Sequence, residues 1–581
     1  MTAMTAPETG RDEAPTPAPA RAPRPTFGHS IDGRDVAWSV LVGAVAMLVA
    51  LLFRSALVPT DPWHYVHGAL AFPDGTWRPA GLSRWGFLLP IVPFARLWGD
   101  STATYYVIPL LTTGSLAAVV FLLGTRYVTR LTGVLGTVLA LATPLVFVNL
   151  TRGYPDLTAT MLVAAGILLA TLAADAALRA GLTEAGWGWR VPALLAAAGF
   201  VTGWSFEVRE TAIFAWPVIG WILWRIGRPA RTLLWFAPPA LVWLVLDIVL
   251  CAIVYDDPLL KFRILLGADI SSSEVASDAS YVGHSRWWYM AVLPRSIWEI
   301  SGGPAVLAAV AVALVGGVVF RAQLGRLWAW GMLSLGLLWL QGGPLDPEHA
   351  SVRLDVARYW LSFLVPLLLV AAGTMVIAVR RAVGAWRGAA WVGSGVLTAG
   401  LVVPAVMFAA TYPGFAPNGG NALSELRDYL ARSGGTPDQR IWADWGTQRV
   451  LPTYQRGPFG DERWEAANIR SLNRLLRLPA VPSDRYPRPG EYVVVYSADD
   501  RTCWHCRRAL TDVEEVFGSF PQSGWEEVFT SSTGNLTLYR LGPSVTWPVL
   551  GEEQLAPGRD DESSDTNGDD GGDGGTEEPG L

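Results

Sequence analysis

The sequence predicts a polytopic α-helical membrane protein with a small α/β domain outside the membrane. Hydrophobic residues make up 51% of its 581 residues, charged residues make up 16%, and the mean hydropathy is +0.31. About eleven apolar stretches are long enough, or nearly long enough, to cross a bilayer as helices. The connections between them alternate between arginine-rich and arginine-poor segments. This composition and pattern are typical of a membrane protein that carries an additional soluble part.

The arginines predict the orientation of the chain. Every second connection carries them, at 126–130, 179–190, 225–231, 321–326 and 380–387. By the positive-inside rule these connections are cytoplasmic, so the others, which hold nearly all the carboxylates, face outward. We therefore expect a multi-pass protein of a bacterial plasma membrane. An odd number of spans with a cytoplasmic start places the C-terminal part outside.

The membrane domain is expected at 36–411, between two segments that cannot bury a core. Residues 1–35 form a Pro/Ala/Arg-rich cytoplasmic arm and residues 548–581 an acidic Gly/Asp tail, and both are expected to be disordered. Two long outer loops, 54–102 and 255–301, are rich in Trp and favour the membrane interface. The expected spans are 36–53, 104–123, 132–150, 157–174, 191–205, 211–224, 232–254, 304–320, 327–340, 360–379 and 389–411.

Residues 412–547 change character and predict the outer α/β domain. Their apolar periodicity predicts one helix and three strands, at 421–433 and at 440–444, 491–496 and 535–541. Cys503 and Cys506 also lie here. In an oxidising compartment a structural disulfide is favoured over a redox pair or half of a zinc site.

Six carboxylates stand beside apolar segments on the expected outer face, where an ionisable group is costly and functional by default. They are Asp61, Asp156, Glu207, Glu210, Asp256 and Asp257. We expect acids of this kind on the outer face alone, which favours chemistry on one side of the membrane over transport across it.

Short motifs at the outer face carry a family resemblance. Asp61 opens the first outer loop, which continues with Arg84-Trp-Gly-Phe-Leu-Leu-Pro. Arg152-Gly-Tyr-Pro-Asp opens the fourth span, and Gly203-Trp-Ser-Phe-Glu-Val-Arg-Glu lies between the fifth and sixth. With an α/β domain after the last span, the chain resembles the GT-C superfamily of membrane glycosyltransferases over about residues 36–545. The likeness is greatest to family 39, the protein O-mannosyltransferases and lipid A aminoarabinose transferases.

The resemblance implies an enzyme that moves a sugar, with inversion, from a polyprenyl-phosphate donor to a cell-envelope acceptor. Asp61 is then the general base, a role worth about 10²–10⁴ in rate. Aromatic neighbours such as Tyr65 often stack on sugar rings. The alternative is that Asp61 caps a helix with Pro62 at its first position. The family's Asp-Glu pair is Asp61-Pro62 here, so a second acid must come from elsewhere, and Asp156 is favoured despite the ordinary preference for acids at helix starts.

Several cations, one histidine and one carboxylate are candidates for substrate binding. A guanidinium suits bidentate binding of a phosphate, and the resemblance makes Arg209 the first choice for the donor phosphate. Mutual pairing of neighbouring charges and anchoring at the lipid headgroups are the alternatives. The other candidates are His64, Arg84, Arg152, Glu207, Lys261 and Arg263.

A divalent metal is a further candidate ligand. Asp61, His64 and His67 stand three residues apart, and such Asp/His sets can bind a metal ion. Asp256 and Asp257 are an equally weak signal. No other cofactor and no nucleic-acid partner are expected.

Two other function classes stay open at this stage. One is a transporter or flippase of lipid-linked sugars, although the sequence shows no internal repeats with broken helices. The other is a polymerase or ligase of envelope polysaccharide, which would not require an acid at the start of the first outer loop.

Overall fold

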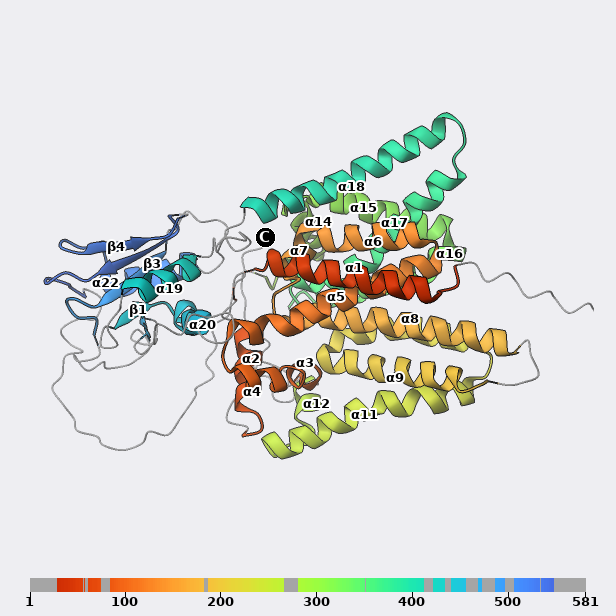
Figure 1. Ribbon diagram of the computed structural model, residues 1–581, viewed down its shortest axis with the longest axis horizontal. Helices are drawn as coiled ribbons and strands as arrows, with labels where there is room; N and C mark the ends of the chain where they lie inside the picture. Colours follow the sequence, from red (N-terminus) through yellow and green to blue (C-terminus); the bar gives the residue numbers. More distant parts are fainter. Residues whose placement is uncertain are drawn as a thin grey trace, which may run out of the picture.

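The computed structural model consists of a bundle of long helices with a smaller α/β domain beyond one end (Figure 1). It describes residues 29–55, 57, 61–74, 84–181, 187–265, 281–348, 350, 352–411, 422–433, 440–455, 469–472, 486–496, 506–532 and 534–547.

Every predicted apolar stretch is helical, which confirms the polytopic helical class. Within the described residues, seven helices are long and apolar enough to cross a membrane, and three apolar stretches are shorter. The total of about eleven spans stays a prediction. The helices of the bundle are α1 Gly33–Leu52, α5 Thr102–Tyr127, α6 Arg130–Ala142, α7 Pro144–Asn149, α8 Pro155–Gly181, α9 Arg190–Val208, η1 Glu210–Ala215, α10 Trp216–Trp224, α11 Pro229–Tyr255, α15 Gly303–Val319, α16 Arg321–Gln341, α17 Leu361–Arg381 and α18 Ala385–Thr411.

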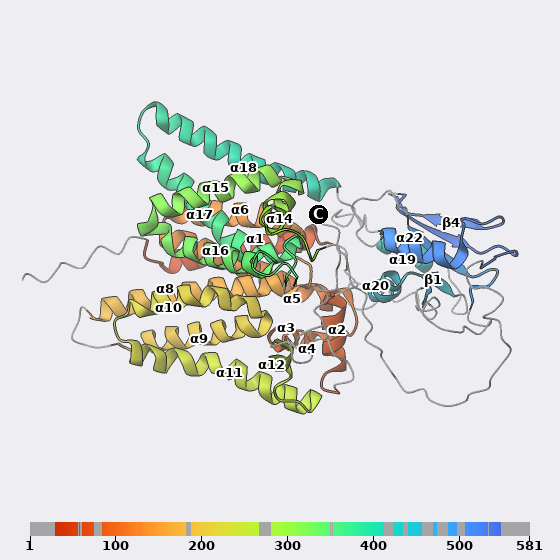
Figure 2. The ribbon, with the colours of Figure 1, turned by 180° about the vertical axis from the view of Figure 1, so that it is seen from behind.

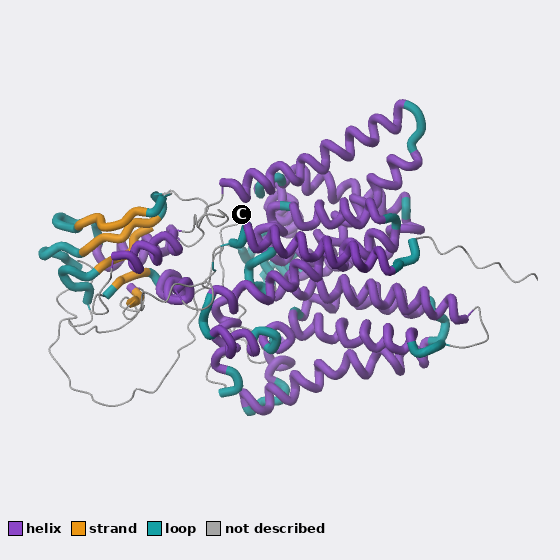
Figure 3. The backbone as a smooth tube through the Cα atoms, in the orientation of Figure 1, coloured by secondary structure: helices purple, strands orange, loops and turns teal. Residues whose placement is uncertain are grey.

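The two expected outer loops contain helices of their own, of which the sequence had indicated only one, the helix that begins at Asp61. They are α2 Asp61–Ala71, α3 Trp85–Leu88, α4 Val92–Trp98, α12 Leu260–Leu265 and α14 Arg286–Glu299. Helices α2, α3, α4 and α12 lie at the end of the bundle that faces the α/β domain (Figures 1 and 2). The α10–α11 and α17–α18 connections, which carry arginines, lie at the opposite end (Figure 3).

Two expectations about the bundle are corrected. The third apolar stretch is broken, because α6 ends before Thr143 and α7 begins at Pro144, which cannot continue the backbone hydrogen-bond ladder. Acids are also present at the arginine end, so they do not cluster on the outer face alone. There, Asp175 accepts two hydrogen bonds from Arg126, at 2.6 and 2.7 Å.

The C-terminal domain is a five-stranded sheet with helices, as the predicted α/β class requires. The strand order is β2-β1-β3-β5-β4, with β1 parallel to β2 and β3, and β5 antiparallel to β3 and β4. The predicted helix and three strands are confirmed as α19, β1, β3 and β5. The predicted disulfide lies outside the described residues. The elements are α19 Ala422–Ser433, β1 Ile441–Ala443, α20 Trp445–Gln455, β2 Ile469–Ser471, β3 Tyr492–Tyr496, α22 Cys506–Phe517, β4 Glu526–Thr530 and β5 Leu536–Arg540.

Helices α9 and α11 pack closely against each other. A Cβ atom on Gly199 would lie 2.0 Å from the carbonyl oxygen of Phe236, and one on Gly203 would lie 2.2 Å from that of Ala240. Small residues allow such close backbone approach between membrane helices. This packing fixes the direction of α9 and therefore the position of the residues that follow Val208.

Gly203→Val is therefore expected to destabilise the fold by about 1–3 kcal/mol, because the added carbons force α9 away from α11. Thermal unfolding in detergent measures the effect. Gly220→Val on α10 is the matched control, since no atom lies within 4 Å of the Cβ position there. Equal melting temperatures for the two variants would contradict the close contact.

Candidate active site at the outer end of the bundle

Asp61 is the first residue of α2, and its carboxylate forms an ion pair with Arg358. The distance from Asp61 Oδ2 to Arg358 Nη1 is 3.0 Å. Arg358 belongs to the short 3-10 helix η2 Ala357–Trp360, which leads into α17. Its guanidinium lies over the ring of Tyr154, 4.6 Å from the centroid. Three segments far apart in the sequence thus meet at Asp61.

The electrostatic environment keeps Asp61 ionised. Burial would raise the pKa of its carboxyl, but the charges of Arg358 and Arg84 outweigh burial and hold the pKa below its usual value. The side chain is 28% exposed, so a substrate hydroxyl has access to it. An ionised and accessible carboxylate can accept a proton.

Asp156 and Arg209 form a second ion pair beside the first. Arg209 Nε lies 2.7 Å from Asp156 Oδ1, and its guanidinium lies over the ring of Tyr359, 4.6 Å from the centroid. Tyr359 directly follows Arg358, so consecutive residues connect the two pairs. Asp156 Oδ2 is buried and has no hydrogen-bond partner among the described residues. Through Arg358 and Tyr359, Asp61 thus lies near the Asp156–Arg209 pair at one end of the bundle.

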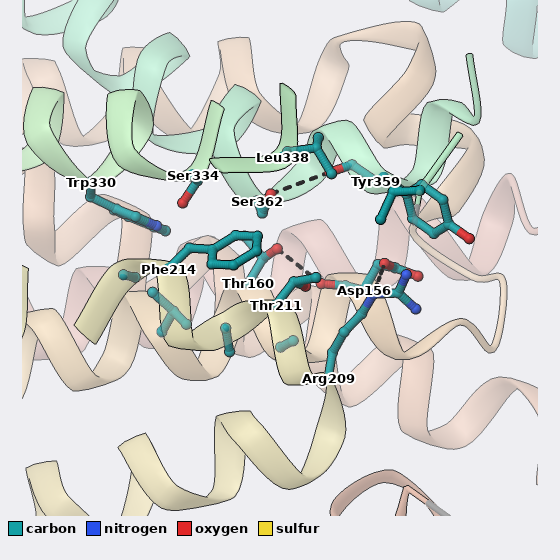
Figure 4. Close-up of a pocket in the computed structure, with 15 residues that line it drawn as sticks. Asp156, Thr160, Arg209, Thr211, Phe214, Trp330, Ser334, Leu338, Tyr359 and Ser362 are labelled. Carbon is teal, nitrogen blue, oxygen red and sulfur yellow. Dashed lines mark hydrogen bonds and ion pairs between the residues drawn. The ribbon is translucent and has the colours of Figure 1, made fainter. Parts of the chain in front are cut away.

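An open cavity begins at the second pair, with about 510 Å³ of empty space that includes its opening to solvent (Figure 4). Asp156, Arg209 and Tyr359 line its charged end, and Trp330 lies at the other end (Figure 4). From Asp156 to Val163 the wall follows seven residues of α8, about 10 Å. Hydroxyls of Thr160, Thr211, Ser334 and Ser362 are interspersed, and the apolar lining is Ala159, Val163, Ala212, Phe214, Ala215, Trp330, Leu338 and Val352.

Arg84 ties α2 to η1 through protein partners. It precedes α3, donates a hydrogen bond from Nη1 to the Tyr65 hydroxyl at 2.6 Å, and lies 3.7 Å from Glu210. Tyr65 is buried, and burial raises its pKa, so the phenol is neutral. These contacts occupy Arg84 and place it second to Arg209 as a ligand for a substrate anion.

Arg152 has no ion-pair partner among the described residues. It lies in the turn before α8, next to Gly153, where a Cβ atom would lie 3.2 Å from Pro62 Cβ. That packing places the turn against the start of α2. The Nε atom of Arg152 is buried without a hydrogen-bond partner in the described part of the chain. An anionic ligand would supply the missing acceptor.

Glu207 and Lys261 pair with each other and do not line the cavity. Lys261 on α12 forms an ion pair with Glu207 on α9 and lies 3.8 Å from Asp247 on α11. All three residues are only 1% exposed. Arg263 forms an ion pair with Asp257 and is half exposed, also apart from the cavity lining. The structure therefore does not bring these three predicted site residues, Glu207, Lys261 and Arg263, to Asp61.

The three residues of the suspected metal set point to different partners. His64 contacts Arg449 of the C-terminal domain at 3.5 Å, and burial and the charge of Arg449 lower its pKa to about 4. His67 lies 3.6 Å from Asp100. Among the described residues, the one group with metal-like spacing is His29, Asp32 and Asp35, at the arginine end. There Arg130 already pairs with both acids.

Sequence reasoning missed Arg358, Tyr359, Tyr154 and Asp247. A signal existed for Arg358, because it immediately precedes a membrane span on the face that the positive-inside rule leaves poor in arginine. A cation at that place is expected to have a specific partner. Asp247 lies inside an apolar stretch, where the energetic cost of a carboxylate would have made it a candidate. Tyr154 lies inside the motif Arg152-Gly-Tyr-Pro-Asp quoted above, whereas for Tyr359 the sequence carries no distinctive signal.

Solved structures resemble this chain only in part. ArnT from Cupriavidus metallidurans, both apo and bound to undecaprenyl phosphate, has a TM-score of 0.44 and 13% identity. This match covers 90% of this chain and all of ArnT. The archaeal oligosaccharyltransferase AglB from Archaeoglobus fulgidus, in complex with an inhibitory peptide and a dolichol-phosphate, has a TM-score of 0.42 and 12% identity. That match covers 74% of this chain and 65% of AglB.

No family model and no curated protein matches the sequence.

Arg358→Gln is expected to raise the pKa of Asp61, because burial still opposes ionisation while the nearest cation is lost. An Arg neighbour typically depresses an Asp pKa by about 1–3 pH units. In the native protein the pair stabilises the fold above pH ~4, and this stabilisation is lost as pH falls through the lowered pKa. Infrared titration of the protonated carboxyl band, assigned by its loss in Asp61→Asn, measures the change.

Arg353→Gln is the matched control for this titration. Arg353 and Asp355 form another ion pair of the same loop, with side-chain exposures of 18% and 28%, as for Arg358 and Asp61. The control is expected to leave the Asp61 titration unchanged. The same titration in both variants would show that Arg358 does not hold the Asp61 carboxylate.

Proposed function

We propose that this protein is a membrane glycosyltransferase. It moves a sugar from a polyprenyl-phosphate-linked donor to a cell-envelope acceptor, whether glycan, lipid or protein, at the outer face of a bacterial plasma membrane. The observation that supports this most strongly is the two neighbouring ion pairs, Asp61–Arg358 and Asp156–Arg209, the second of which lines the charged end of a largely apolar cavity.

The cavity matches both parts of a lipid phosphate. Its apolar lining along α8, η1 and α16 suits an isoprenoid chain, which loses contact with water on entering. At the charged end, Asp156 is the one ion-pair partner of the Arg209 guanidinium among the described residues. Arg209 and Arg152 therefore have donors available for phosphate oxygens, and planar guanidinium groups bind such oxygens in a bidentate manner.

In the proposed reaction the acceptor hydroxyl oxygen attacks the anomeric carbon of the donor sugar. Asp61 accepts the hydroxyl proton as the new carbon–oxygen bond forms. The bond from the anomeric carbon to the phosphate oxygen breaks, and polyprenyl phosphate leaves with the electron pair. A single displacement of this kind inverts the anomeric configuration. Arginines at the phosphate stabilise the charge that develops on the leaving group.

Asp156 would act beside Asp61 as the second acid. Its Oδ1 orients Arg209, while its unpartnered Oδ2 is available to a sugar or acceptor hydroxyl. Glu207 and Lys261 would support the site indirectly, through the end of α9.

Asp61→Asn is expected to lower transfer by about 10²–10⁴-fold, because the amide cannot accept the proton. The assay is transfer of label from radiolabelled polyprenyl-phosphate sugars in membranes. Asp355→Asn is the control, because Asp355 is an equally exposed, ion-paired acid of an outer loop. Undiminished transfer by folded Asp61→Asn would remove Asp61 from the mechanism.

The proposed orientation can be tested independently of activity. Exposed tryptophans occur at both ends of the bundle, as expected for two membrane interfaces: Trp189, Trp224 and Trp386 beside arginine loops, and Trp287 and Trp298 on α14. A reporter fused after Gly551 is expected to show extracytoplasmic activity. A cytoplasmic signal would reverse the topology and exclude the proposed outer-face reaction.

A further inference from the structure

The C-terminal domain contacts the membrane domain at the helix that carries Asp61. Helix α20 lies beside α2 in both ribbon views (Figures 1 and 2). Buried apolar residues of the two helices belong to one continuous cluster, which includes Tyr65 and Ala69 of α2 and Val450 and Leu451 of α20. The two domains therefore share a core at this point.

Arg449 is the central polar residue of this contact. Its guanidinium lies 4.4 Å from the ring centroid of Trp63 on α2 and 4.7 Å from that of Trp445 on its own helix. Its Nη1 lies 3.5 Å from His64 Nε2. Trp63 and His64 follow Asp61 by two and three residues, so Arg449 contacts the same helical turn that carries the carboxylate.

A second polar contact fixes the same interface one helical turn further along α20. Thr453 donates a hydrogen bond to Asp100 Oδ1 at 3.0 Å, and Asp100 Oδ2 lies 3.6 Å from His67 on α2. His67 in turn stacks on Trp63 with 3.8 Å between ring centroids. Contacts from α20 thus reach α2 directly and through Asp100.

Helix α2 depends on such contacts for its position. It has 11 residues, and isolated helices shorter than about 12–15 residues are marginal in water. Tertiary packing must therefore hold it. A displacement of about 1 Å in a reacting group can cost about 10²-fold in rate.

We propose that Arg449 is a positioning residue of the transferase site: by holding the first turn of α2 it keeps Asp61 against Arg358 at the cavity. The C-terminal domain is then a working part of the catalytic site. This inference rests on the proposed function for its kinetic consequence, but its structural consequence can be measured without any activity.

The first experiment measures hydrogen exchange of the full-length protein in detergent. Arg449→Gln is expected to speed exchange of the α2 amides by roughly 5- to 30-fold, the effect of losing one or two kcal/mol of local stability. Exchange in α8 should not change. Arg440→Gln is the matched control, because Arg440 is a partly buried arginine of the same domain that pairs with Glu491 instead. Unchanged exchange of α2 in Arg449→Gln would overturn the proposal.

The second experiment measures transfer kinetics, for which the proposal predicts a specific division between kcat and KM. Arg449→Gln should lower kcat by roughly 10- to 100-fold and leave the donor KM unchanged, because Arg209 and Arg152 keep their places. Arg449→Lys, which keeps the positive charge, should recover part of the loss and also serves where the Gln variant yields no folded protein.

The outcomes separate this proposal from the proposed function. A rise confined to the acceptor KM would make Arg449 a binding residue and overturn its positioning role. Wild-type kcat in folded Arg449→Gln would also overturn it, while the transferase stands. Absence of transfer by the wild type would reject the function, and faster α2 exchange would still support the structural role of Arg449.

Discussion

Two connected ion pairs hold together the end of the bundle that faces the C-terminal domain. Asp61 binds Arg358, Asp156 binds Arg209, and the Tyr359 ring beneath Arg209 directly follows Arg358 in the chain. Each acid and each cation comes from a different part of the sequence. Removing one member would leave a partly buried charge without its partner, which is more costly than losing a surface pair. The arrangement therefore constrains α2, α8, the end of α9 and the start of α17 together.

Further charges support this arrangement without reaching the cavity. Glu207, Lys261 and Asp247 are buried together, and they attach α12 and α11 to the end of α9. Glu207 stands two residues before Arg209, so this cluster anchors the backbone that delivers the cation to Asp156. On the other side, Arg84 connects Tyr65 of α2 with Glu210 of η1. Both sets hold the backbone in position. The buried atoms without a hydrogen-bond partner among the described residues include Arg84 Nε, Arg152 Nε, Asp156 Oδ2 and Glu210 Oε1.

Some polar groups of the candidate site are paired within the protein, whereas others can still bind a ligand, and this difference indicates which kind of ligand fits. Available cations sit where a cavity lined by apolar side chains begins. An amphipathic ligand with an anionic headgroup satisfies both environments at once, whereas a free nucleotide sugar would leave the apolar part empty. Asp61 stands outside the lining of that cavity and remains accessible. In the proposed reaction, the acceptor hydroxyl would therefore reach Asp61 from a different side than the lipid phosphate. The contact between α20 and α2 extends this organisation to the C-terminal domain.

The class of the fold, the helical character of every apolar stretch and the main elements of the α/β domain could all be predicted from the sequence. So could three members of the candidate site, Asp61, Asp156 and Arg209. These follow from local properties, namely hydropathy, periodicity and the cost of charge beside apolar segments. The partners of the charged side chains could be identified only from the tertiary structure. Glu207 was expected near substrate and instead binds Lys261, while Arg358, which the sequence analysis had passed over, became the partner of Asp61. Pairing depends on distances between residues that lie tens to hundreds of positions apart in the sequence. Helix packing sets those distances, whereas hydropathy and local motifs do not encode them.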